Sequence, residues 1–304
     1  MFELLLLLTL CLNISSDIVD RRISGLSNPR ALTLWAAILQ LLLVCPFIFW
    51  VQWPGWPHVG LLLLVGVFSG FAREYWYRAL AQTHEQLSRF VPFVRLSSVL
   101  VLALAILLLG ETMTPLMAAG ALLMIGAGFI ISLERYGGSW REFMHANRAL
   151  ALVAVFATSN AFISVSYKYL LGHELNIITI YFFLKLFQCL PLVTKAVVEG
   201  TLISSRKEIA RPLWFVLSRL FQTVAALVFL LVLYRLPLTR VEPLMALSPF
   251  LYLAWEWVER RIERRFSLRG TAATTAGATE RRVLILRVVA TGMTIVGLIL
   301  LHQK

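Results

Sequence analysis

Residues that carry catalysis or bind metals are scarce in this sequence of 304 residues. Its two aspartates, Asp17 and Asp20, lie three positions apart, and its three cysteines, Cys11, Cys45 and Cys189, all fall within apolar runs. Cysteine acts there as a small hydrophobic residue, with no disulfide or metal-binding spacing. The five histidines are scattered in or near the connecting segments. Membrane enzymes need paired aspartates, a histidine cluster or a metal set, so we predict no enzyme, metal or cofactor.

Charged residues are also few, at 14% of the chain, whereas hydrophobic residues make up 59%. Apolar segments of about 20 residues recur, which is long enough to cross a hydrocarbon core of about 30 Å. A net charge of +12 would suggest nucleic acid in a soluble protein. Here the retention of Lys and Arg in cytoplasmic loops explains it better. We therefore predict an integral membrane protein with no nucleic-acid partner.

The apolar segments predict an all-α membrane protein with ten transmembrane helices. Turn-forming residues separate several of them, as at 25–29, 53–57 and 137–138. The first segment has neither a basic region before it nor a cleavage site after it, so we interpret it as a true span and not as a signal peptide. The expected spans are 2–20, 31–50, 59–80, 88–109, 114–133, 148–170, 175–194, 212–234, 241–258 and 283–302.

Two stretches of the chain are similar to each other. Residues 87–97 read LSRFVPFVRLS and residues 238–248 read LTRVEPLMALS. Weaker echoes relate Asn13 to Asn160 and Arg21 to Lys168, both 147 positions apart. Such self-similarity predicts a duplicated chain, with copies at 1–146 and 147–304. Between 87–97 and 238–248, five residues are identical at an offset of 151. In the first stretch they are Leu87, Arg89, Pro92, Leu96 and Ser97, and in the second they are Leu238, Arg240, Pro243, Leu247 and Ser248.

Each predicted copy holds five spans, and an odd number makes the second copy enter the membrane from the opposite side. Inverted repeats of this kind are typical of secondary transporters, which bind their ligand near the bilayer midplane between the copies. Pro92 and Pro243 begin equivalent spans, so we predict that each lets one gate hinge during alternating access. The alternative is that proline is merely tolerated in a first helical turn.

Basic residues predict the orientation. The loops after the odd-numbered spans hold 20 Lys and Arg residues, and the opposite side holds 4. The positive-inside rule then places both termini outside the cytoplasm. Eight of the 20 lie in or beside the basic loop 259–282, which we expect to contact anionic lipid headgroups.

The stretch LLLGETMTPLMAAGALLMIGAGFIIS at 107–132 has a Gly-Glu pair, Gly110 and Glu111, ahead of a span that contains glycine. It resembles the drug/metabolite transporter superfamily, specifically its EamA-like members with ten helices. Residues 247–259 and 290–301 are a degraded version that lacks Gly-Glu. The resemblance implies transport of small organic molecules by alternating access, and both termini in the cytoplasm, which the charge pattern opposes. For Glu111 it leaves open whether the residue caps a turn or takes part in transport.

Four basic residues lie deep within predicted spans: Arg73, Arg95, Lys185 and Arg219. Each would cost about 2.5–3.5 kcal/mol at a helix centre facing lipid. They must therefore line a wet cavity, pair with an acid or bond backbone carbonyls. Because deep cations outnumber deep acids, we predict an anionic or zwitterionic substrate.

Polar stripes at helical spacing mark the same spans. Tyr181, Lys185 and Gln188 share one face, and Met245, Ser248, Tyr252 and Glu256 share another. Inter-helix hydrogen bonding would also explain such stripes. The predicted substrate-binding residues are Arg73, Tyr77, Arg95, Asn160, Tyr167, Tyr181, Lys185, Gln188, Arg219, Gln222 and Tyr252.

A coupling proton would need a titratable acid within the membrane. The candidates are Asp17, Glu74, Glu242 and Glu256. For Asp17 an ion pair with Arg21, four residues on, is the simpler account. For Glu242 the alternative is an acid favoured by the dipole at a helix start.

These patterns predict a secondary transporter that moves a small organic metabolite across the cytoplasmic (inner) membrane, with H⁺ as a candidate coupling ion that the sequence does not assign. The alternative is a non-transporting adaptor, or a partner of a flippase or scramblase for lipid-linked substrates. Glycines at 120, 126, 128, 292 and 297 let helices approach closely. Their two spans are therefore the candidates for a homodimer contact.

Overall fold

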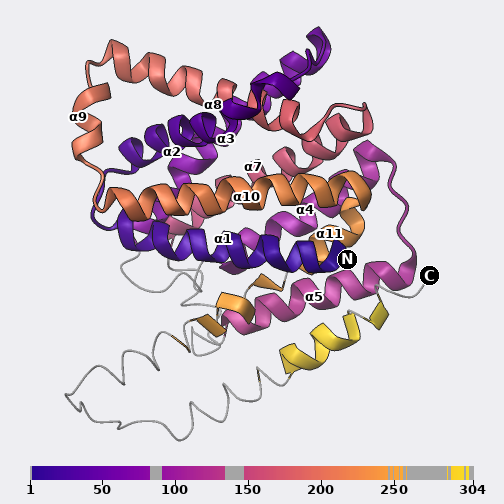
Figure 1. Ribbon diagram of the computed structural model, residues 1–304. Coiled ribbons are helices and arrows are strands. Elements are labelled where there is room, and N and C mark those ends of the chain that lie inside the picture. Colours follow the sequence, from indigo (N-terminus) through magenta and orange to yellow (C-terminus); the bar gives the residue numbers. More distant parts are fainter. Residues whose placement is uncertain are drawn as a thin grey trace, which may run out of the picture.

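A computed structural model of the chain describes residues 2–82, 91–133 and 147–245, and beyond them 247–248, 250–252, 254–255, 258, 286, 289–297 and 299–300. For residues 82, 91–96, 128–129, 131–133, 147–151 and 153 it describes the backbone alone. All regular structure within these described ranges is helical (Figure 1). The predicted all-α class is confirmed for them.

Helices follow one another with short connections. Their order is α1 (Phe2–Ser24), α2 (Pro29–Val44) continued by the 3₁₀ helix η1 (Cys45–Trp50), α3 (Trp56–Gln82), α4 (Val91–Leu109), α5 (Pro115–Leu133), α7 (Asn147–Gly172), α8 (Ile177–Val198), α9 (Leu202–Lys207), α10 (Pro212–Arg235) and α11 (Leu238–Met245).

Local sequence fixes several helix starts. The side chain of Asn28 accepts a hydrogen bond from the Arg30 amide at 3.0 Å, and that of Asn176 accepts one from the Thr179 amide at 2.6 Å. Such side chains satisfy amide groups that a first turn leaves unpaired. Pro212 begins α10, where a missing N–H costs nothing.

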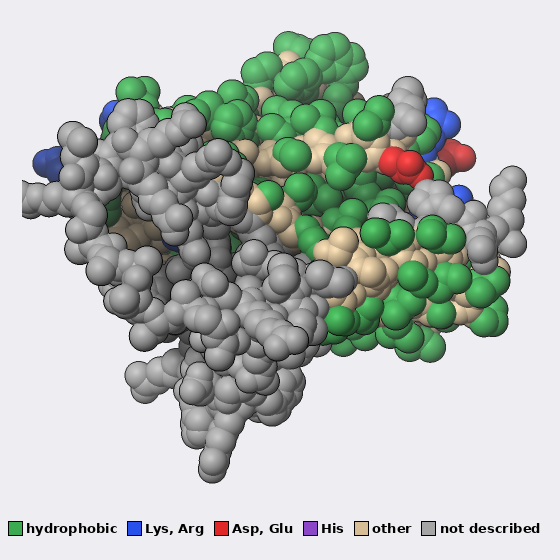
Figure 2. Space-filling view, turned by 90° about the horizontal axis from the view of Figure 1, so that it is seen from below, with side chains coloured by type: hydrophobic (Ala, Val, Ile, Leu, Met, Phe, Trp, Pro, Cys, Tyr) green, Lys and Arg blue, Asp and Glu red, His purple; other side chains and the backbone are tan. Residues whose placement is uncertain are grey.

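Five helices among the described residues are long and apolar enough to cross a membrane: Phe2–Ser24, Pro29–Trp50, Trp56–Ala81, Ile177–Val198 and Pro212–Arg235. Two shorter apolar helices cover Ser97–Leu109 and Pro115–Ala127. Large hydrophobic side chains on them face outward, and Figure 2 shows such side chains across the middle of one face, with charged groups toward its ends. The chain is an integral membrane protein, whereas the full set of ten spans stays a prediction.

Helices from the two halves of the chain pack against each other. α1 packs mainly against α10, and the two lie side by side in Figure 1, while α3 packs mainly against α7 and α8. The two largest apolar clusters of the described residues result from this packing. The Leu6 cluster includes Leu6, Leu62, Val101, Ala161, Leu170, Tyr181 and Leu230, and the Trp76 cluster includes Ile14, Ile18, Leu32, Trp76, Tyr77, Phe156 and Phe215.

The crossing of α3 and α8 depends on a glycine. A Cβ atom at Gly66 would lie 2.7 Å from Cβ of Phe187 and 3.0 Å from the Leu184 carbonyl oxygen. Neither a Cβ atom nor backbone can swing away, so the helices would have to separate.

We expect Gly66→Ala to lower the free energy of unfolding by about 1–3 kcal/mol, the usual cost of overpacking. The measurement is denaturant or thermal unfolding in detergent. Gly60→Ala is the matched control on the same helix, because a Cβ there meets nothing within 4 Å. It should be neutral or stabilise by up to about 1 kcal/mol through helix propensity. Equal effects of the two changes would contradict a tight crossing at Gly66.

Candidate functional site

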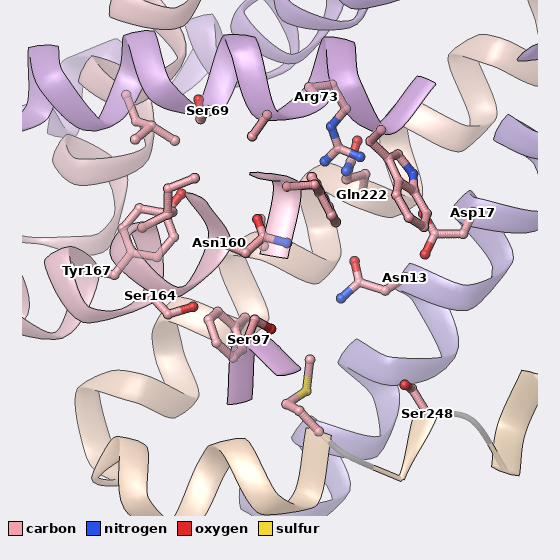
Figure 3. Close-up of a pocket in the computed structure, with 18 of the residues that line it drawn as sticks. Asn13, Asp17, Ser69, Arg73, Ser97, Asn160, Ser164, Tyr167, Gln222 and Ser248 are labelled. Atoms are coloured by element: carbon pink, nitrogen blue, oxygen red, sulfur yellow. The ribbon is translucent and has the colours of Figure 1, made fainter. Parts of the chain in front are cut away.

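A polar cavity of about 260 Å³ lies between helices of both halves of the chain. α1 reaches it at Asn13, α3 at Ser69 and α7 at Asn160, each close to the middle of its helix (Figure 3). The Leu6 cluster lies toward one end of these helices and the Trp76 cluster toward the other. The cavity is therefore a polar space at mid-length, with apolar packing on either side.

The structure brings most of the predicted stripes together around this space. Eight predicted substrate-binding residues and two coupling candidates line it. They are Arg73, Asn160, Tyr167, Tyr181, Lys185, Gln188, Gln222 and Tyr252, with Asp17 and Glu242. Their part in binding or coupling stays a prediction.

Arg73 is a cavity cation that forms no hydrogen bond or ion pair among the described residues. Its guanidinium reaches from α3 into the space, with Gln222 beside it and Asp17 beyond (Figure 3). It makes no hydrogen bond or ion pair with any other residue that the structure describes. A guanidinium offers five donors in a planar fork that matches a carboxylate or phosphate, so this side chain is free to bind an acidic group.

Lys185 is the second cavity cation, and its partners are neutral. Its ammonium donates to Oε1 of Gln188 at 2.9 Å and lies 5.3 Å from the ring centroid of Tyr181. Only 7% of Lys185 is exposed, so the cavity is its main route to polar surroundings. An ammonium has three donors, and an amide acceptor uses one of them.

The cavity also holds carboxylates, which come from α1 and α11. Oδ2 of Asp17 accepts a hydrogen bond from the Tyr252 hydroxyl at 2.5 Å. Oε2 of Glu242 accepts one from the Ser98 hydroxyl at 3.0 Å. Each of these bonds joins one half of the chain to the other. The lining is thus mixed in charge, with the cations on α3 and α8 and the acids on α1 and α11.

Arg219 and Tyr77 do not line the cavity. Arg219 is fully buried and forms an ion pair with Asp20, whose carboxylate also accepts from the hydroxyls of Ser218 at 2.7 Å and Tyr77 at 3.3 Å. A second guanidinium nitrogen of Arg219 donates to Gln222. Of the explanations left open for the deep cations, pairing with an acid accounts for this one.

The remaining candidates fall outside the cavity or outside the described residues. Glu74 pairs with Arg78 one turn along α3 and lies 3.6 Å from Arg30 Nε. Pro243 is a buried residue inside α11. Glu256 and the side chains of Arg95 and Pro92 are not among the described parts of the chain. No group of three or more His, Cys, Asp or Glu residues that could hold a metal is present in the described ranges.

Several lining residues were missed by the sequence analysis as site residues: Asn13, Gln40, Ser69, Trp76 and Ser97. The internal repeat could have identified two of them, Asn13 and Ser97, because each has an equivalent residue in the second copy. Asn13 and Asn160 are equivalent positions, as are Ser97 and Ser248, and all four line the cavity. Gln40 had no such signal, and it is placed by a hydrogen bond of 3.0 Å from its amide nitrogen to Gln222.

Comparison with known proteins relates part of this chain to a protein family. Residues 2–133 match the EamA-like transporter family. This part of the chain is EamA-like. No curated protein matches the sequence. A solved structure titled only "Crystal structure of protein" shares the fold, with a TM-score of 0.67 and 14% identity over 100% of this chain and 99% of the other. The fold likeness therefore extends beyond the EamA-like part.

The Gly-Glu pair of the EamA-like part has a clear structural position. Gly110 has φ of +65°, which glycine adopts readily and other residues rarely. Glu111 follows it, and its two carboxylate oxygens accept hydrogen bonds at 2.9 Å from the amides of Leu238 and Thr239 at the start of α11. The sequence left open whether Glu111 caps a turn or takes part in transport. The structure shows that it caps the start of a helix, and that this helix lies in the other half of the chain.

Proposed function

We propose that this protein is a secondary transporter that moves a small organic metabolite with an acidic group across the cytoplasmic membrane. The observation that carries the proposal is Arg73, a cation at mid-helix depth that faces a polar cavity without a described protein partner. An uncompensated charge inside a membrane is costly and marks a pathway or a ligand site more often than a scaffold.

Two inverted five-helix repeats, 1–146 and 147–304, are the architecture we propose for transport. The reciprocal packing of α1 on α10 and of α3 on α7 supports it, because each pair joins the first helix of one copy to the third of the other. Arg73 and Arg219 are themselves 146 positions apart, within one residue of the offset of the weaker echoes. In such repeats the ligand lies between the copies at the midplane.

Alternating access fits the distribution of apolar packing around the cavity. The Leu6 cluster and the Trp76 cluster lie on opposite sides of it along the helices. Opening one cluster while the other stays closed would expose the cavity to one side of the membrane at a time. We keep the prediction that both termini lie outside, and that Pro92 and Pro243 permit the two openings.

The lining favours a small substrate with one acidic group. The volume of about 260 Å³ is at or below the low end of typical ligand pockets, about 300–1,000 Å³. Arg73 and Lys185 would hold the acidic group, and Trp76 and Tyr167 offer apolar surface to the rest. Asp17 would accept either a coupling proton or a cationic group of a zwitterionic substrate.

A ligand screen tests the proposal. Purified protein is heated with carboxylates, phosphates, amino acids, nucleosides and organic cations in turn. A ligand at about 100 times its Kd adds ~2.7 kcal/mol, which is a visible shift in Tm. We expect hits among anions or zwitterions, lost in Arg73→Gln. Hits confined to cations would refute the acidic substrate. No hit in any class would favour the non-transporting adaptor.

A further inference from the structure

The junction between α10 and α11 lacks the backbone partners that a helix interior would supply. α10 ends at Arg235 and α11 begins at Leu238, with Leu236 and Pro237 between them. Helix ends leave carbonyl groups unpaired at the C-terminus and amide groups unpaired at the N-terminus. The described stretch of α11 that follows is Leu238–Met245.

Two side chains of opposite charge complete this junction. Glu111, from the connection between α4 and α5, accepts from the first two amides of α11. Lys168, on α7, donates to the carbonyl oxygens of Leu233 at 2.7 Å and Leu236 at 2.9 Å. Each charge matches the helix dipole at the end it contacts.

The junction is connected to the cavity through α11. Glu242 and Met245 line the cavity, four and seven residues after Leu238 and on the same side of the helix. A shift at the start of α11 therefore moves the cavity wall. Gly110 and the bond from the Glu111 amide to the Ala105 carbonyl, 3.3 Å long, hold the Glu111 backbone at the end of α4.

We infer that Glu111 and Lys168 are positioning residues that clamp the α10–α11 junction and so set the position of the cavity wall carried by α11. The clamp joins the EamA-like part to the second half of the chain. The inference rests on the proposed function only in treating the cavity as the transport site. In this inference the Gly-Glu pair, which lies in the first half of the chain, positions a helix of the second half.

The first test is hydrogen exchange of the segment 236–245 in the full-length protein without ligand. Glu111→Gln keeps the size of the side chain but leaves one acceptor oxygen for two amides. We expect exchange in this segment to be at least 10-fold faster, and exchange in α1 to be unchanged. Lys168→Gln should act in the same direction, and Lys168→Arg should restore protection. Glu208→Gln, an exposed acid on the α9 side, is the matched control. Unchanged exchange in Glu111→Gln would overturn the clamp.

The second test measures the cavity wall itself and needs no ligand. The three native cysteines are replaced by serine, Met245→Cys is introduced, and its rate of alkylation by a water-soluble reagent is measured. We expect Glu111→Gln to change the rate at least 10-fold, and Glu208→Gln to leave it unchanged. Faster exchange without a changed labelling rate would mean that Glu111 only caps a helix, and would overturn the positioning role.

Failure of the proposed function would appear elsewhere. The ligand screen uses neither Glu111 nor Lys168, so an empty screen together with changed labelling would refute the transporter and keep the clamp. Ligand hits together with unchanged exchange and labelling would keep the transporter and refute the clamp.

Discussion

Asp20→Asn is expected to lower the free energy of unfolding by about 3–5 kcal/mol, the cost of breaking a buried ion pair by removing one partner. Arg219 is fully buried, and besides Asp20 its direct contacts among the described residues are neutral: Ser218, Gln222 and the ring of Tyr77, whose centroid lies 5.8 Å from the guanidinium carbon. Without the Asp20 carboxylate, a fully buried charge would lose its ion-pair partner. The measurement is the unfolding midpoint in detergent.

Two controls separate this effect from a general loss of polar contacts. Glu74→Gln removes the partner of Arg78 and Arg30, which are 38% and 64% exposed, and should cost no more than about 1 kcal/mol. The double change Asp20→Asn with Arg219→Met removes both charges and should recover part of the loss. If Asp20→Asn costs no more than Glu74→Gln, the pair does not stabilise the fold.

The second large effect concerns ligand affinity. Arg73→Gln should weaken binding of the anionic hit by roughly 10- to 150-fold, the equivalent of one hydrogen bond to a charged group at about 1.5–3 kcal/mol. Lys185→Gln should do the same if its ammonium shares the acidic group. Kd values from titration of each variant measure both effects.

The double variant tells whether the two cations hold the same group. Residues that contact one shared partner give effects that do not add, with interaction energies of about 0.5–3 kcal/mol. Arg78→Gln is the matched control, because it lies five residues from Arg73 on the same helix and pairs with Glu74. Its Kd should equal that of the unaltered protein. Strictly additive losses from Arg73 and Lys185 would place the two cations at separate subsites.

The length of the apolar segments was enough to predict the helical class, and helical spacing was enough to predict several residues that line the cavity. The stripe of Tyr181, Lys185 and Gln188 lies on one face of α8 because helical spacing dictates it, and all three line the cavity. The turn predicted at 25–29 matches the end of α1 at Ser24 and the start of α2 at Pro29. Ten spans and the inverted repeat remain predictions beyond the five long apolar helices described.

The roles of Arg219 and Glu111 depended on contacts between distant segments, which spacing cannot supply. Arg219 lies in the same kind of apolar run as Arg73, and only the position of Asp20, 199 residues away, makes it a structural cation. Glu111 ends one span and caps a helix 127 residues later. The local sequence predicted that Arg219 and Glu111 need a polar partner, but it did not identify the partner of either residue.

The pairing of Asp20 with Arg219 also has a consequence for biosynthesis. Ribosomes add about 5–20 residues per second, so Arg219 follows Asp20 by roughly 10–40 s. For that interval the nascent α1 carries a carboxylate whose partner has not yet been made. α1 is therefore made with this carboxylate unpaired, and the ion pair that joins the two halves can form only after α10 has been synthesised.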